Sequence, residues 1–175
     1  MNINCIVNGS LYENCYIIND KDKNALIIDP GSELDKIIDF INNNQLNVVG
    51  ILITHYHFDH VTILDDVIKI YKCPVVDYKS KLNNKIHHFN FSVIKNYGHT
   101  MDSVSFLFKK YKVMFTGDFV FKGSIGNYPY ENENMMYNSL KEFIKMDDNI
   151  VIYPGHGDKS SIKEEKEYNY FLRGL

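Results

Sequence analysis

Cysteine is scarce in this sequence, and no apolar run in it is long. The 175 residues include three cysteines, Cys5, Cys15 and Cys73, which are odd in number and far apart, so we expect no disulfide framework. No apolar run approaches the roughly 18 residues that cross a membrane. The first residues do not show a basic stretch, an apolar core and a small-residue cleavage site. These absences predict a cytoplasmic protein that does not bind a membrane.

A strong excess of charge is also missing. Lys and Arg number 19 against 22 Asp and Glu, which gives a formal net charge of −3. No basic stripe with interleaved aromatic residues is present, although nucleic-acid binding usually requires one. We therefore expect a small-molecule substrate and no nucleic-acid partner. The length predicts one domain over residues 1–175, and the sequence does not define the oligomeric state.

The chain does contain a dense cluster of side chains that bind metals. The apolar run 51–53 predicts a buried strand, and His55, His57, Asp59 and His60 follow within six residues. Side chains two apart on an extended chain point the same way, so His55 and His57 can share one ion. Asp59 and His60 come after the chain has turned, so they can face a second ion nearby. The alternative is a helix start that Asp59 caps, with surface histidines, but four potential ligands so close together disfavour it.

Apolar periodicity predicts alternating strands and helices, which favours helices packed on the faces of sheets. Strands are expected at residues 2–8, 15–18, 25–29, 48–53, 74–76, 89–96, 104–108, 113–116 and 150–153. Helices are expected after an N-cap at Ser32, over 61–71, over 135–144, and after Ser160 and Ser161. Residues 79–88, with His87 and His88, are expected to form a surface loop, and 119–130 a loop over the site. Met135 and Met136 are expected in the core.

The histidine cluster resembles a family signature. His55-x-His57-x-Asp59-His60 is similar to the H-x-H-x-D-H motif of the metallo-β-lactamase superfamily. The other motifs of that family have counterparts in the same order, each at the end of an expected strand: Asp29-Pro30-Gly31, Gly98-His99-Thr100, Gly117-Asp118 and Pro154-Gly155-His156-Gly157. The resemblance implies an α+β fold, the αββα sandwich of two mixed β-sheets flanked by helices.

The resemblance also implies a set of metal ligands. His55, His57 and His99 would hold one ion, while Asp59, His60 and His156 would hold the other, with Asp118 bridging them. Asp29 would support the metal site by holding its ligands in place, without binding a metal itself. Two divalent ions are implied, with zinc expected and iron or manganese as alternatives.

The implied activity is that of a binuclear metal-dependent hydrolase similar to the glyoxalase II type. Asp118 stands where many antibiotic-hydrolysing members have a cysteine. Two metal ions lower the pKa of a shared water from near 16 to about 7, so hydroxide can attack a small thioester or ester. Asp59 would be catalytic because it can also accept the proton of that water.

Two other functions remain open. One is a persulfide (sulfur) dioxygenase of the same superfamily, with a single iron held by Asp118, His55, and either His99 or His57. The other is a non-catalytic binding protein, against which the complete ligand set speaks.

The sequence departs from the family pattern where specificity is set. Asn127-Tyr128-Pro129 follows Gly126, where the family usually has Arg, then Asp, then Pro to brace the loop. The chain is expected to match short members that lack the C-terminal glutathione-binding domain. Substrate-binding residues are not identified, although 119–134 is expected to supply the pocket walls.

Overall fold

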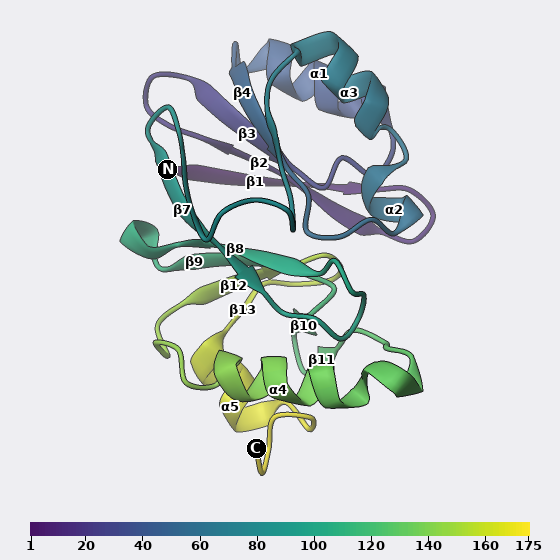
Figure 1. Cartoon of the computed structure of the whole chain (residues 1–175). Helices are drawn as coiled ribbons and strands as arrows, with labels where there is room; N and C mark the ends of the chain where they lie inside the picture. The colour runs from purple at the N-terminus through teal and green to yellow at the C-terminus, as the bar shows by residue number, and fades with distance from the viewer.

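The computed structural model describes residues 1–175 as two mixed β-sheets packed face to face, with helices on both outer sides (Figure 1). The first sheet has the order β1-β2-β3-β4-β5 and consists of β1 (Asn2–Asn8), β2 (Glu13–Asn19), β3 (Asn24–Ile28), β4 (Asn47–Leu52) and β5 (Val75–Val76). The second has the order β13-β12-β9-β8-β7-β6 and consists of β6 (Asn83–Ile86), β7 (Phe89–Lys95), β8 (Val104–Phe108), β9 (Val113–Gly117), β12 (Val151–Pro154) and β13 (Ser160–Ser161). The predicted αββα sandwich is confirmed.

Helices cover the outer face of each sheet. In Figure 1, α1 (Leu34–Asn43) and α3 (Leu64–Tyr71) lie on the first sheet, and α4 (Glu133–Phe143) and α5 (Ile162–Tyr168) lie on the second. The short α2 (Phe58–Val61) sits at the edge between the sheets, and two 3₁₀ turns are η1 (Lys109–Tyr111) and η2 (Tyr130–Asn132). None of the helices has the length and apolar character needed to cross a membrane.

Side-chain alternation along the strands divides the core into three layers. Every residue of β2 is buried, because its two faces pack against different layers. Ile18 belongs to the cluster between the sheets, where Phe106 and Phe115 also lie. Ile17 belongs to the cluster that includes residues of α1 and α3, and Met136 of α4 belongs to a third cluster. Apolar packing therefore occupies both faces of each sheet, and the strand ends remain for polar chemistry.

Two pairs of parallel strands bring four loops to one edge of the sandwich. β3 pairs with β4 in parallel, and β9 pairs with β12 in parallel. Because parallel strands end on the same side of a sheet, the loops after these four strands meet. These loops begin with Asp29, Ile53, Asp118 and Gly155.

Two helix predictions need correction. Ser32 does not cap α1, because its hydroxyl donates to Glu13 Oε1 at 2.6 Å, and the N-cap position is Glu33 with a φ of 53°. The helix expected over 61–71 is divided into α2 and α3 by Thr62 and Ile63.

Two loop predictions are also partly wrong. Asn83–Ile86 pairs with β7 as strand β6, so residues 79–88 are not wholly a loop. The segment 119–130 contains a small hairpin of β10 (Val120–Phe121) and β11 (Ser124–Ile125). Of the two methionines expected in the core, Met136 is buried and Met135 is 39% exposed.

Candidate metal centre

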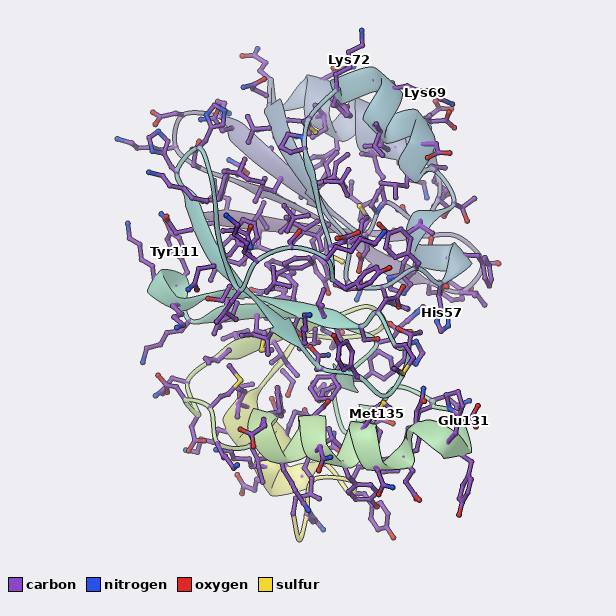
Figure 2. The ribbon with its side chains drawn as sticks, in the orientation of Figure 1. His57, Lys69, Lys72, Tyr111, Glu131 and Met135 are labelled. Carbon is purple, nitrogen blue, oxygen red and sulfur yellow. The ribbon has the colours of Figure 1, made fainter.

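The structure brings together all seven side chains that the sequence predicts as metal ligands. They lie at the edge where the strand ends meet, and Figure 2 shows His57 at this edge, facing the beginning of α4. Their ligand atoms form three groups, each within 4.8 Å: His55, His57 and His99; Asp59, His60 and His156; and His55, His60 and Asp118.

Three imidazole nitrogens converge in the first group. His57 Nδ1 lies 3.2 Å from His55 Nε2 and 2.9 Å from His99 Nε2. Around a tetrahedral ion with nitrogen ligands at about 2.0–2.1 Å, the donors stand roughly 3.3 Å apart. The spacing is therefore close to what one such ion requires.

The second group combines two imidazoles with a carboxylate. Asp59 Oδ2 lies 3.3 Å from His156 Nε2 and 3.8 Å from His60 Nε2. Asp118 stands between the two groups, because its Oδ1 is 3.3 Å from His60 Nε2 and its Oδ2 is 3.7 Å from His99 Nε2. This is the position that a bridging carboxylate would take.

Hydrogen bonds behind the histidines direct their free nitrogens inward. Thr54 Oγ1 donates to Asp29 Oδ2 at 2.6 Å, so it must accept a proton from His55 Nδ1, 3.1 Å away. His99 Nδ1 donates to the carbonyl of Asn127 at 2.5 Å, and His156 Nδ1 donates to the carbonyl of Leu11 at 3.1 Å. Each ring keeps its Nε2 lone pair for the centre, as in known metal sites.

Asp29 links two ligand-bearing segments. Its carboxylate accepts from the Thr54 backbone N–H at 2.8 Å and pairs with His60 Nδ1 at 3.1 Å. The residue is 2% exposed and has a φ of 51°. Its contact with His60 agrees with the expected supporting role.

Two buried atoms and one glycine indicate that a cation fits here. His60 Nε2 and Asp118 Oδ1 are close but not aligned, and both are buried without a hydrogen-bond partner. Buried polar atoms normally have partners, and a metal ion would satisfy both. A Cβ at Gly155 would lie 2.1 Å from Asp118 Oδ1, so a glycine is needed beside this carboxylate. Imidazole and carboxylate together suit zinc, iron or manganese.

The histidines of the centre differ in the direction in which their pKa values are shifted. Burial lowers the pKa of His55 well below its ordinary value, and it also lowers the pKa of His99. Burial acts in the same direction on His60, but the contact with Asp118 and the bond to Asp29 outweigh it and raise that pKa to about 10. Burial raises the pKa of Asp118, yet its histidine neighbours, His60 first, lower it to about 2. His55 and His99 therefore offer neutral imidazoles at pH 7, whereas a metal would have to displace a proton from His60.

Sequence reasoning missed several supporting groups. Thr54 directly precedes His55, and a hydroxyl at that place was a usable signal. The carbonyls of Leu11 and Asn127 are backbone groups, so no side chain reveals them. Asn14 Nδ2 donates to the carbonyls of Pro154 and Gly157 at 3.0 and 2.9 Å, which ties the beginning of the chain to the loop of His156.

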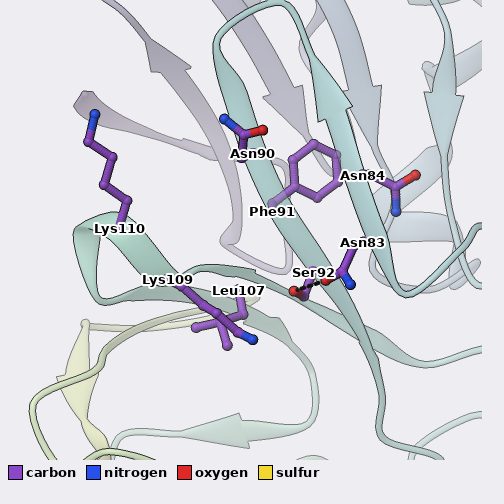
Figure 3. Close-up of a pocket in the computed structure, with 8 residues that line it drawn as sticks. All are labelled: Asn83, Asn84, Asn90, Phe91, Ser92, Leu107, Lys109 and Lys110. Atoms are coloured by element: carbon purple, nitrogen blue, oxygen red, sulfur yellow. Dashed lines mark hydrogen bonds between the residues drawn. The ribbon is translucent and has the colours of Figure 1, made fainter.

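Two exposed histidines, one surface group of acidic residues and one pocket lie away from this centre, whereas a second pocket reaches it. His87 and His88 are exposed, as expected, and the Asp20, Asp22 and His88 group is also at the surface. The pocket of about 230 Å³ in Figure 3 is lined by strands β6, β7 and β8 and by Lys109 and Lys110, without a metal-ligand side chain. A more open hollow of about 350 Å³ does reach His156 and is lined by Phe121, Lys122, Gly157 and Asp158.

Comparison with known proteins relates nearly the whole chain to one family. The family model described as the metallo-beta-lactamase superfamily matches residues 8–89 and 84–156. The chain is 31% identical over 208 aligned positions to the hydroxyacylglutathione hydrolase GloC of Haemophilus influenzae, covering 98% of each protein.

Solved structures show the same fold. The BLEG-1 B3 metallo-beta-lactamase superposes with a TM-score of 0.94 at 26% identity, covering 99% of this chain and 100% of that one. The protein TTHA1623 in a di-iron-bound form superposes with a TM-score of 0.86 at 25% identity, covering 96% of this chain and 99% of that one.

Proposed function

Because this chain belongs to the metallo-β-lactamase superfamily, we propose that it is a metal-dependent hydrolase with a two-metal centre that cleaves small hydroxyacyl thioesters. The main support is the similarity along nearly the whole chain to a protein named hydroxyacylglutathione hydrolase, together with the seven converging ligand atoms. The di-iron-bound form of TTHA1623, a structural neighbour, supports a centre of two ions.

The residues of the centre have distinct proposed roles. One ion would be held by His55, His57 and His99. The other would be held by Asp59, His60 and His156, and Asp118 would bind both. When bound, two such ions supply Lewis acidity and lower the pKa of water from near 16 to about 7. Zinc is the proposed metal, since neutral imidazoles and carboxylates suit it, and iron and manganese accept the same ligands.

Asp59 is the proposed proton acceptor. Its side chain is 12% exposed and reaches the centre beside His156 at 3.3 Å. A carboxylate at that place can take a proton from water as the water attacks the thioester carbonyl. Asp29, behind His60, keeps that imidazole oriented and does not touch substrate.

The deciding experiment pairs metal analysis with a hydrolysis assay on the purified protein. We expect about two metals per chain, and turnover of S-lactoylglutathione or a 2-mercaptoethanol thioester that is lost on chelation and restored by zinc. The Asp118→Ala variant is the matched control for turnover by contaminants. Protein that contains two metals per chain but hydrolyses no thioester would contradict the proposed substrate class.

The same experiment tests two other functions. The fold similarity to a B3 metallo-beta-lactamase makes β-lactam hydrolysis the second candidate, so a chromogenic cephalosporin is included. About one iron per chain, with oxygen consumption on a persulfide and no thioester turnover, would instead indicate the dioxygenase.

A further inference from the structure

A buried carboxylate outside the metal centre is not used by the proposed chemistry. Glu165 of α5 is 1% exposed. Its Oε1 accepts from Ser160 Oγ at 2.5 Å, and its Oε2 accepts from the Gly123 backbone N–H at 2.9 Å and from Asn169 Nδ2 at 2.7 Å. A carboxylate buried so completely needs all of these donors.

Two of these contacts hold the tip of the β10–β11 hairpin. Gly123 lies in the two-residue turn and has a φ of 76°, which favours glycine. Its N–H binds Glu165, and the carbonyl of the next residue, Ser124, accepts from Asn169 Nδ2 at 2.9 Å. Helix α5, together with its C-cap residue Asn169, therefore fixes both a donor and an acceptor of the hairpin.

The chain segments on either side of this hairpin reach the metal centre. The hairpin starts just after Asp118, and two residues beyond it the carbonyl of Asn127 binds His99 Nδ1. Gly126, which directly precedes Asn127, is packed closely against both Asp118 and His99. A Cβ at Gly126 would lie 1.7 Å from the Asp118 carbonyl oxygen and 3.1 Å from His99 Nδ1. A shift of the hairpin would therefore move the group that orients His99.

We propose that Glu165, assisted by Asn169, is a positioning residue for the metal centre. It clamps the hairpin from α5 so that the Asn127 carbonyl keeps His99 Nε2 directed at the metal. This proposal depends on the two-metal centre proposed above, but its test requires no substrate.

A volume-matched pair of variants tests the clamp. Glu165→Leu removes both carboxylate oxygens that accept these hydrogen bonds. The backbone amides of residues 120–127 in the metal-free protein should then exchange hydrogen about 10–100-fold faster, because this factor corresponds to the stabilisation that a hydrogen bond to a charged acceptor provides. Zinc affinity, measured against a chelating dye, should fall about 10–100-fold, as when a group behind a ligand is lost.

Glu165→Gln should retain both properties. The amide oxygen can accept from Gly123 and Asn169, and its NH₂ can donate to Ser160 Oγ. The Ser160 proton can then go to Glu164 Oε2, which is 3.0 Å away. This rescue distinguishes loss of the hydrogen bonds from loss of charge.

Ser160→Ala is the matched control, since it removes one bond to the same carboxylate without touching the hairpin. Normal exchange and zinc affinity in Glu165→Leu, or an equal loss in Ser160→Ala, would overturn the proposal. If Glu165→Leu does not fold, Asn169→Ala decides, because the only hairpin group that it releases is the Ser124 carbonyl. It also removes one bond to Glu165 and the bond that Asn169 Oδ1 accepts from the Phe171 N–H, neither of which involves the hairpin. Faster exchange at 120–127 with weaker zinc binding is then expected, and wild-type values would overturn the proposal.

Discussion

At the scale of single residues, the centre depends on hydrogen bonds made on the far side of each imidazole. The Nδ1–H groups of His55, His99 and His156 are bound to Thr54, Asn127 and Leu11, and this fixes which nitrogen stays free. The sequence names the histidines, but these contacts determine which of their nitrogens can bind a metal.

Removing a ligand should abolish metal binding without unfolding the protein. We expect Asp118→Ala, and likewise His57→Ala, to lose most bound metal. Their activity should fall by more than the roughly 10–100-fold that is typical when a residue hydrogen-bonded to a ligand is removed. Neither side chain is part of the apolar core clusters, so far-ultraviolet circular dichroism should stay unchanged. Metal analysis and the thioester assay measure the effect, with the exposed Asp22→Ala as control. Full activity in Asp118→Ala would refute the site assignment.

Zinc affinity should rise with pH because His60 carries a proton in the metal-free protein. Its pKa is raised from 6.5 to about 10, so the protonated form stabilises the metal-free fold below pH 6.5, and this stabilisation is lost as the pH rises through about 10. Zinc must displace that proton, so the apparent affinity should increase about tenfold per pH unit between pH 7 and 9. Competition with a chelator of known pH dependence measures this increase. A pH-independent affinity would show that His60 is already neutral.

At the scale of secondary-structure elements, neighbouring elements override local sequence preference. Asn83–Ile86 is polar, yet it forms a strand because β7 offers an edge to pair with. Ser32 is a good capping residue by type, but its hydroxyl donates to Glu13 of strand β2. Such contacts between distant residues cannot be deduced from periodicity.

Helix α4 gives a matched pair of methionines. Met136 is fully buried against the second sheet, and Met135 is 39% exposed. Met136→Ala should lower the free energy of unfolding by about 2–5 kcal/mol through the cavity it leaves. Met135→Ala should change it by less than about 0.5 kcal/mol. Urea denaturation of both variants tests the difference. Equal losses of unfolding free energy would contradict the finding that, of the two methionines, only Met136 is buried.

At the scale of the whole molecule, the candidate ligands come from both sheets. His55, His57, Asp59 and His60 follow β4 of the first sheet, whereas His99, Asp118 and His156 follow strands of the second. Any ion held by these residues would therefore join the two sheets at their common edge.

Chelation should consequently lower the melting temperature. Metal at 100 times its dissociation constant stabilises the fold by about 2.7 kcal/mol, which corresponds to roughly 5–10 °C for a chain of this size. Calorimetry with and without a chelator, followed by addition of zinc, measures the shift. The Asp118→Ala variant should respond much less, and a melting temperature unaffected by chelation in the wild type would refute the metal link.

The sequence by itself determined the family and the αββα fold, because its motifs stand in order at the ends of apolar strands. Through the resemblance of those motifs to the family's, it also named Asp29 and every candidate ligand. Only the tertiary structure decided the tautomers of the histidines, the bonds of Leu11, Thr54 and Asn127, and the clamp of Glu165 on the hairpin. The physical reason is that these contacts join backbone carbonyls and buried polar groups far apart along the chain, and no local pattern of residue types encodes such pairings.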